Sequence, residues 1–433
     1  MLNLITFKEK ITRWNIIQEN DQILIAVSGG ADSITLLHLL YALKKEKNFE
    51  IFCATLNHGI RDDAEKDVEF VKKFCKELNV QCFEGKIDTI NYAKSNKLSL
   101  EEAGRILRYD FLIKLSQRLK CNKIAIAHNL NDLVENVIFR ISRGTGTFGI
   151  PGMKPVNLPY IRPLIFFSRS EILDYIYKNN LKYVEDYTNK DIKYTRNFIR
   201  HRIVPLLKNI NPNLEKAILH LSENVWELDE YIDKKTNIKA ERLRGRLYFD
   251  LPEEKTIIIE TIRRLCIKYF KKVPDKEKLD RLKANLGKTT FKISFWGNFG
   301  VEISYGKVLL GEFVERKEYE YKINTNLMNQ KYYIDPYLVE IGKGGIIFNK
   351  EKINGDLILR NWRDGDKTKS GKKLKKIFVA KKIPSFIRRI IPVLTDNDGI
   401  IYVPKVYIWK DGLTKDSRKG ISVRVVLKGG LLF

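Results

Sequence analysis

The chain has 433 residues, more than one hydrophobic core usually serves, so we expect two or three domains. Its 79 Lys and Arg residues against 53 Asp and Glu residues give a formal charge of +26, which no fold requires and which favours a polyanionic partner such as nucleic acid. The alternative is a solvated basic surface in a lysine-rich proteome, and the position of the charge along the chain has to separate the two.

Five cysteines are spread along the chain without a CxxC pair and without Cys/His ligand spacing. Neither a disulfide framework nor a zinc site is therefore predicted, and we expect buried thiols in a reducing compartment. The N-terminal stretch MLNLITFKEKITRW lacks the apolar core and cleavage site of a signal peptide, and no apolar run approaches the roughly 18 residues of a membrane span. We expect a cytoplasmic protein with no membrane association.

Apolar strand-like runs alternate with helical patterns through the first 165 residues. This alternation is typical of an α/β domain with a mostly parallel, Rossmann-like sheet. The predicted strands are 23–27, 51–56, 123–128 and 161–167, and the predicted helices are 33–45, 64–78 and 133–142.

The pattern becomes helical from Asn211, through LEKAILHLSENVWELDEYIDKK and IIIETIRRLCIKYFKK, and then predicts short strands in FKISFWG and GVEISYGKVLLGE. The charged segment 316–333 has the composition of a linker. Short β-like runs around a basic helical pattern follow it and predict a small α+β domain. The predicted domains are 1–205 (α/β), 206–330 (mainly helical) and 331–433 (basic α+β).

The first predicted strand runs directly into SGGADS, residues 28–33, and then into a helix. Backbone N–H groups at such a helix start form a nest that binds phosphate, and the glycines let phosphate oxygens approach the main chain. Asp32 can hold the Mg²⁺ that accompanies a polyphosphate. The loop lacks the Walker A and dinucleotide-fold patterns. The alternative is a tight turn in which serine and aspartate merely cap the helix.

Further polar residues follow predicted strands or share a predicted helix. Arg105 and Arg108 lie three apart on one helix face, where they either reach a developing negative charge or pair with neighbouring glutamates. Asp132 is either an N-cap or a carboxylate that binds magnesium or an ammonium group. His58 and His128 each follow a strand at its carboxyl end, where open α/β sheets bind ligands, although a lone histidine is more often structural.

Basic residues concentrate between 360 and 389, which is the pattern of a surface that binds a polyanion. Trp362 and Phe378 can stack on unpaired bases or belong to the core. The alternative for the basic residues is a solvated cationic face. The candidates for binding RNA are Arg363, Lys372, Lys373, Lys375, Lys376, Arg388 and Arg389, together with a second cluster of Arg196, Asn197, Arg200 and Arg202.

The loop SGGADS resembles the SGGxDS signature of the PP-loop ATP pyrophosphatases, which release pyrophosphate while adenylating a substrate. Further stretches resemble, in order, motifs of the tRNA(Ile)-lysidine synthetase family: LNHGIR, EEAGRILRYDFL, AHNLNDLVENVIFRISRGTGTFGIPGM, RPLIFFSRSEI and TNKDIKYTRNFIRHRIVP. RNWRDGDKTKSGKKLKKIFVAKKIP resembles that family's C-terminal tRNA-binding domain. Where many members carry AHHxDDQxET, this chain keeps Asp132 but has asparagine at 129, 131 and 136.

The resemblance implies that ATP adenylates the C2 oxygen of the wobble cytidine in a CAU-anticodon isoleucine tRNA. The ε-amine of free L-lysine then displaces AMP to form lysidine. It implies ATP at Ser28, Gly29, Gly30, Ala31, Asp32, Ser33, His58 and His128, Mg²⁺ on Asp32, and catalytic roles for Asp32, Arg105, Arg108 and Asp132. Another PP-loop RNA-modifying enzyme and a non-catalytic RNA-binding protein stay open as alternatives, as does a homodimer.

Overall fold

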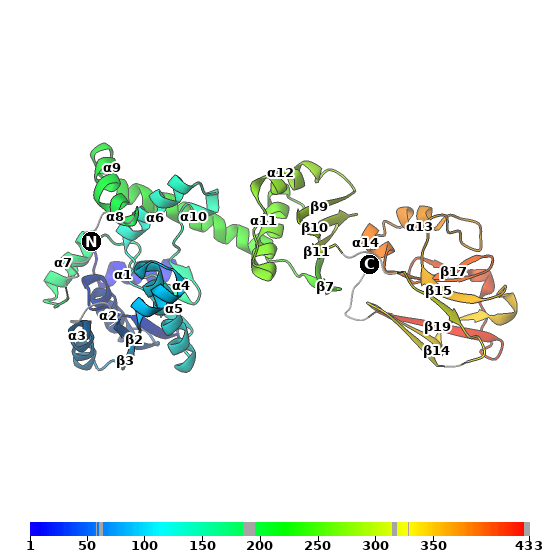
Figure 1. Ribbon diagram of the computed structural model, residues 1–433, viewed down its shortest axis with the longest axis horizontal. Coiled ribbons are helices and arrows are strands. Elements are labelled where there is room, and N and C mark those ends of the chain that lie inside the picture. The colour runs from blue at the N-terminus through cyan, green and yellow to red at the C-terminus, as the bar shows by residue number, and fades with distance from the viewer. Residues whose placement is uncertain (58, 60–63, 185–194, 314–317, 328, 428–433) are drawn as a thin grey trace. The chain divides into compact units, whose positions relative to one another are not determined.

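The computed structural model describes residues 1–57, 59, 64–184, 195–313, 318–327 and 329–427 (Figure 1). The chain forms two compact units, Met1–Glu230 and Tyr231–Phe433. The boundaries expected at 205/206 and 330/331 stay predictions. None of the described helices is long and apolar enough to cross a membrane.

The first unit is built on a six-stranded sheet of order β3-β2-β1-β4-β6-β5, in which β5 alone is antiparallel to its neighbour. The strands are β1 (Gln22–Ala26), β2 (Glu50–Asn57), β3 (Cys82–Lys86), β4 (Lys123–Ala125), β5 (Val156–Asn157) and β6 (Tyr160–Ile161). The predicted parallel α/β sheet is therefore confirmed. The strand predicted at 161–167 is wrong beyond Ile161, because Pro163 has no N–H for a strand ladder and the chain turns there.

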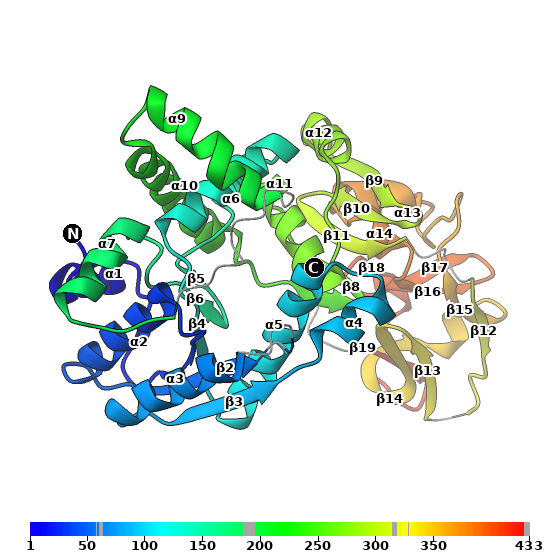
Figure 2. The same ribbon diagram turned by 60° about the vertical axis from the view of Figure 1, so that its left-hand side comes forward.

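Alternate residues of β1 face opposite sides of the sheet, which gives the unit three layers (Figure 2). Ile23 and Ile25 belong to the larger core, whereas Leu24 packs with Leu112 and Leu115 of α5 on the other face. The helices are α1 (Leu4–Arg13), α2 (Ala31–Lys44), α3 (Ala64–Glu77), α4 (Thr89–Asn96), α5 (Leu100–Arg118), α6 (Leu130–Arg143), α7 (Arg169–Lys178), α8 (Thr195–Phe198), α9 (Val204–Ile210) and α10 (Leu214–Thr236), which continues past the unit boundary at Glu230.

The second unit begins with a mixed region around its own core, in which Ile262 of α11 packs with Phe295 and Val301 of the sheet. The helical content expected for 206–330 is present, but a five-stranded antiparallel sheet accompanies it, and its first two strands were not predicted. The elements are β7 (Glu241–Leu243), β8 (Arg246–Asp250), α11 (Lys255–Leu265), α12 (Lys276–Asn285), β9 (Thr290–Trp296), β10 (Phe299–Ser304) and β11 (Lys307–Glu312).

The C-terminal region has two antiparallel sheets that share one core, and its predicted α+β character is confirmed. One sheet has the order β12-β15-β16-β17-β18 and the other β13-β14-β19. The elements are β12 (Glu320–Ile323), β13 (Gln330–Ile334), β14 (Tyr337–Asn349), β15 (Leu357–Asn361), α13 (Leu374–Ala380), α14 (Ser385–Arg388), β16 (Pro392–Asp396), β17 (Gly399–Val403), β18 (Tyr407–Ile408) and β19 (Gly420–Leu427).

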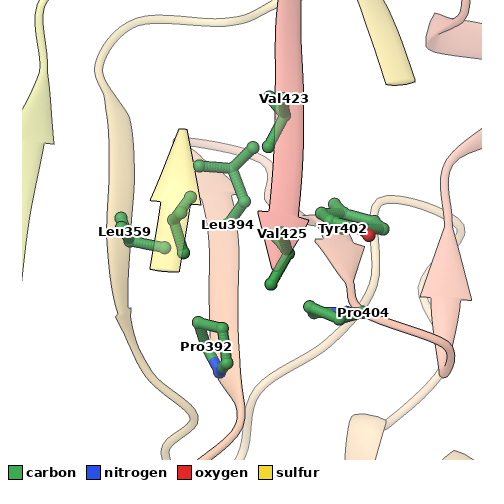
Figure 3. A pocket seen from close by; sticks show the side chains of 8 residues that line it. Leu359, Pro392, Leu394, Tyr402, Pro404, Val423 and Val425 are labelled. Carbon is green, nitrogen blue, oxygen red and sulfur yellow. The ribbon is translucent and has the colours of Figure 1, made fainter. Parts of the chain in front are cut away.

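A small apolar cavity of about 10 Å³ lies in this shared core, where Leu359 and Leu394 of one sheet face Val423 and Val425 of the other (Figure 3). Its volume is that of a single water-sized probe, so it has no room for a ligand. Phe378 is fully buried and packs edge-on against Trp362, with ring centroids 5.6 Å apart. The hypothesis that these two rings stack on RNA bases is therefore wrong for Phe378, which belongs to the core.

Candidate active site

The loop of residues 28–33 connects β1 to α2 at the carboxyl end of the central strand. Gly29 has a φ of +89°, which favours glycine, and its carbonyl accepts the N–H of Val184 at 3.0 Å. The Ser33 hydroxyl donates to the Gly30 carbonyl at 2.9 Å and accepts the Ser28 N–H at 3.2 Å. Ser33 therefore shapes the loop from within, while the exposed Ser28 hydroxyl is the one that can reach a ligand.

Gly30 is the N-cap residue of α2, and among the described residues no side chain bonds to the first N–H groups of the helix. The alternative in which Ser28 or Asp32 caps the helix is therefore wrong. An uncapped helix start presents backbone donors and the positive end of the helix dipole, which together bind phosphate. The helix start therefore offers the free backbone donors that an anion site requires.

Asp32 and Asp132 come together beside this loop, one from α2 and one from α6. Nη1 of Arg169 lies 2.5 Å from Oδ1 of Asp32. Burial raises the pKa of Asp32 above its usual value, Arg169 opposes the shift, and the charge of Asp132 adds to it. Burial likewise raises the pKa of Asp132. Two adjacent carboxyls whose ionised forms need a positive partner are the donor set that a hard divalent cation prefers.

The three asparagines that depart from the family pattern all have structural partners. Asn129 is the N-cap of α6: its Oδ1 accepts the Asp132 N–H at 3.1 Å, and Oδ2 of Asp132 accepts the Asn129 N–H at 3.0 Å. Asp132 is thus the third residue of a capping box and not the N-cap. Asn131 accepts the backbone N–H of Arg169 at 2.9 Å, which fixes the start of α7 beside Asp32.

Asn136 holds the segment that follows α6. Its Oδ1 accepts Nε of Arg140 at 3.0 Å, and the same guanidinium donates to the Gly149 carbonyl at 3.2 Å. Gly152, with a φ of +59°, lies so close that a Cβ there would sit 2.0 Å from Oδ1 of Asn136. The RGTG to GM motif is therefore held by an Asn136–Arg140 clamp that requires glycine at 152.

His128 lies among arginines at the carboxyl end of β4. Nε of Arg162 donates to its Nδ1 at 3.2 Å, so the neutral ring carries its proton on Nε2. Burial, together with nearby positive charge, lowers the pKa of His128 to about 3. The arginines responsible are Arg162, Arg108, Arg196 and Arg105. The structure therefore brings the predicted Arg105 and Arg108 to the same place as His128, while His58 lies outside the described residues.

Arg105 and Arg108 share one face of α5, as predicted. Their guanidinium groups lie 5.8 and 5.6 Å from the centroid of the Tyr109 ring. In the described part of the chain, neither arginine has an ion pair with Glu101 or Glu102, so the surface-pair alternative is wrong. The charges of both arginines act on His128, which places them near the site.

Arg200 was predicted to bind RNA, but its guanidinium makes a bidentate pair with buried Glu135, with Nε–Oε1 and Nη2–Oε2 distances of 2.6 and 3.0 Å. Nη2 also lies 3.5 Å from Oδ1 of Asp132. Burial raises the pKa of Glu135, and Arg200 opposes the shift. Arg200 thus belongs to the inner wall of the site. Arg196 and Arg202 are exposed and Asn197 is half-buried. The RNA-binding role expected of these three residues stays a prediction.

The predicted basic surface of the C-terminal region divides into two groups. Lys372, Lys373, Lys375 and Lys376 are exposed at the start of α13, and among the described residues no carboxylate pairs with any of them. The three arginines are engaged within the protein. Arg389 pairs with buried Glu302 at 2.9 Å, Arg388 donates to the Ile383 carbonyl at 2.8 Å, and Arg363 pairs with Glu320 at 2.5 Å.

Two site residues were not predicted, Arg162 and Arg169. Both lie in RPLIFFSRSEI, a stretch that resembles a family motif and starts at the carboxyl end of a sheet strand. That position was the available signal, because ligands of open α/β sheets bind there. The side chains were missed because their partners, His128 and Asp32, are distant in sequence.

The chain resembles known proteins along its whole length. A PP-loop domain model matches residues 4–207, and a TilS substrate C-terminal domain model matches residues 359–425. The chain is 52% identical to the tRNA(Ile)-lysidine synthase of Thermosipho africanus over 100% of both chains, and 34% identical to that of Thermotoga maritima over 90% of this chain and 92% of the relative. The solved U34-tRNA thiolase NcsA from Methanococcus maripaludis aligns with a TM-score of 0.45 and 20% identity, covering 53% of this chain and 80% of that one. Because the 52% identity extends through both matched domains and everything between them, the chain belongs to the tRNA(Ile)-lysidine synthase family.

Proposed function

We propose that this protein joins the ε-amine of free L-lysine to C2 of the wobble cytidine of an isoleucine tRNA with a CAU anticodon. In the first step the cytidine C2 oxygen attacks the α-phosphorus of ATP and pyrophosphate leaves. In the second step the amine attacks C2 and AMP leaves with that oxygen. The observation that carries the proposal is the uncapped phosphate loop at residues 28–33 with Asp32 and Asp132 beside it.

The phosphate loop binds the ATP phosphates through the first N–H groups of α2 and the Ser28 hydroxyl. Arg105 and Arg108 place positive charge toward the same site, where it stabilises the negative charge that develops on pyrophosphate as it leaves. Neutral His128 donates from Nε2 and accepts Arg162 at Nδ1. These groups bind and orient the nucleotide without transferring a proton themselves.

Asp32 and Asp132 are the residues that would hold Mg²⁺. The donor set fits this ion, because both groups are carboxyls and their buried charges need a cation. When bound, Mg²⁺ supplies positive charge to the polyphosphate. Asp132 has a second candidate role, the binding of the lysine ammonium, and Asp132→Asn separates the two. A magnesium ligand changes the Mg²⁺ dependence of ATP–pyrophosphate exchange without lysine, whereas a lysine ligand changes only the KM for lysine.

The tRNA backbone is proposed to bind Lys372, Lys373, Lys375 and Lys376 in one unit and Arg196 and Arg202 in the other. These cations are exposed and no described carboxylate pairs with them, so they neutralise phosphate at little cost. Such contacts position the RNA without reading its sequence. Arg388 and Arg389 bond within the protein, whereas Arg363 pairs with Glu320 at the surface, so the RNA-binding role expected of these three arginines stays a prediction.

The test is mass spectrometry of isoleucine tRNA after incubation with enzyme, ATP, Mg²⁺ and lysine. We expect a lysine-sized mass gain at the wobble cytidine and release of AMP and pyrophosphate. A matched tRNA with uridine at that position should gain nothing. ATP–pyrophosphate exchange without a mass gain would instead indicate another PP-loop RNA-modifying activity, and tRNA binding without exchange would indicate a non-catalytic RNA-binding protein.

A further inference from the structure

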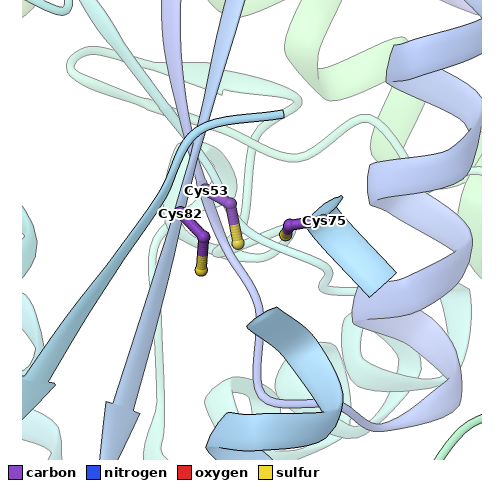
Figure 4. A group of neighbouring side chains, drawn as sticks. All are labelled: Cys53, Cys75 and Cys82. Atoms are coloured by element: carbon purple, nitrogen blue, oxygen red, sulfur yellow. The ribbon is translucent and has the colours of Figure 1, made fainter. Parts of the chain in front are cut away.

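Three of the five cysteines meet at one point of the first unit, although the sequence predicted only separate buried thiols. Cys53 of β2 and Cys82 of β3 are directly opposite each other in the parallel pair, and α3 brings Cys75 over them (Figure 4). Their sulfur atoms all lie within 4.8 Å of one another. Cys53 and Cys75 are fully buried, whereas Cys82 is partly exposed and leaves a route from solvent.

The simplest alternative is that the three thiols fill the core as small apolar groups. The geometry goes beyond filling, because two strands and a helix bring the three sulfur atoms within 4.8 Å of one another (Figure 4). A tetrahedral zinc site has Zn–S bonds of about 2.3 Å and hence sulfurs about 3.8 Å apart, so these thiols need to close by about 1 Å at most.

We propose that Cys53, Cys75 and Cys82 bind a thiophilic d¹⁰ cation, zinc in the cell, as three thiolate ligands. Glu84 lies two residues beyond Cys82 on β3 and thus on the same face, so its carboxylate or a water completes the site. Glu84 pairs with Lys72 at 2.7 Å, and both side chains are more than half exposed. Such a surface pair is weak, so Glu84 can leave Lys72 to bind the metal. Three thiolates, the carboxylate and Zn²⁺ leave a net negative charge beside Lys72.

The site would tie α3 to the sheet edge next to the phosphate loop. Val71, one turn before Cys75 on α3, lies 3.6 Å from the position of a Cβ on Gly29. A metal at Cys75 therefore holds the helix that packs against the loop. Its role is structural, and its first effect is on stability.

The test uses the full-length protein, purified under reducing conditions and depleted of metal. We expect a stoichiometric amount of Co²⁺ to produce a thiolate-to-cobalt charge-transfer band, and Zn²⁺ to displace it. Zinc at a hundredfold excess over its Kd should raise Tm by on the order of 5 °C. Because Cys82 is partly exposed, the Cys82→Ser variant should fold, but it should lose the charge-transfer band. Cys121→Ser, a partly exposed cysteine outside the cluster, should keep it.

Several outcomes would overturn the proposal. One is a reduced wild-type protein that binds neither cobalt nor zinc and shows no change in Tm. Another is a charge-transfer band that survives in Cys82→Ser. A mass loss of two hydrogen atoms on oxidation by air, with no metal bound by the reduced protein, would assign the cluster to a disulfide pair instead.

Discussion

Nη1 of Arg169 lies 2.5 Å from Oδ1 of Asp32, the carboxylate at the end of the phosphate loop. Asn131 fixes the start of α7 and so places Arg169 there. Burial opposes the charge of Asp32, so this oxygen needs a positive partner. Arg169 and Mg²⁺ would therefore compete for the same carboxylate oxygen.

Asp32→Asn should abolish turnover and leave tRNA affinity nearly unchanged. The neutral amide cannot hold magnesium on the polyphosphate, and the loss of one metal contact costs on the order of 10²-fold or more in rate. ATP–pyrophosphate exchange and tRNA titration measure the two effects. Asp110→Asn is the control, since Asp110 is exposed on α5 and pairs only with Lys114 in the described structure. Near wild-type exchange by Asp32→Asn would refute the assignment.

As the pH is lowered, the rate of adenylation should begin to fall at a pH above the usual pKa of an aspartate side chain. Burial raises the pKa of both Asp32 and Asp132, so their ionised, cation-binding forms are lost earlier as the pH falls. His128, with a pKa of about 3, stays neutral throughout. Arg169→Gln removes a charge that lowers the pKa of Asp32, so it should move this acid limb to higher pH. The measurement is the rate of ATP–pyrophosphate exchange as a function of pH, with Arg118→Gln as the control. An acid limb that does not move in Arg169→Gln would contradict the electrostatic coupling between Arg169 and Asp32.

Arg105→Ala should slow adenylation more than it weakens ATP binding. A cation directed at charge on the leaving group acts mainly in the transition state. Single-turnover rates and ATP affinity separate the two effects. Arg118→Ala, near the end of the same helix, should change neither. A pure rise in the KM for ATP would make Arg105 a ligand of the ground state.

Arg200→Ala should lower the free energy of unfolding by about 2 kcal/mol, because it leaves the buried Glu135 carboxylate without its bidentate partner. Arg202→Ala, at an exposed position in the same turn, should change stability by less than about 0.5 kcal/mol. Denaturant unfolding of both variants measures the difference. Equal stability with a selective loss of tRNA affinity in Arg200→Ala would return Arg200 to the RNA surface.

Replacing Lys372, Lys373, Lys375 and Lys376 with alanine should weaken binding to all tRNAs. It should also reduce the slope of log K against log salt by up to about 3, because up to four phosphate contacts are lost. Truncation before Glu351 is a poorer test, since it cuts through the core that Phe348 shares with Val423. Arg389→Ala, which breaks the pair with Glu302, is the control and should change stability but not the slope. An unchanged slope in the lysine variant would move the backbone contacts to Arg196 and Arg202.

The sequence alone determined the features that neighbours in the chain create. The strand-loop-helix at 22–44 was predicted because an apolar run, two glycines and a helical period follow one another, and the parallel sheet followed from the alternation of such segments. β3 was missed because CFEGK is a short edge strand with no continuous apolar run. The strand at 161–167 was overpredicted because buried turns and buried strands are equally apolar.

Only the tertiary structure decided which charged or thiol side chains meet. Arg169 reaches Asp32, Arg200 reaches Glu135, and the three cysteines converge from two strands and a helix. Periodicity tells which face of an element is buried but not which residue of another element will lie opposite it. Charge and thiol partners separated by tens of residues are set by strand order and helix packing, and these depend on the whole core rather than on any local pattern.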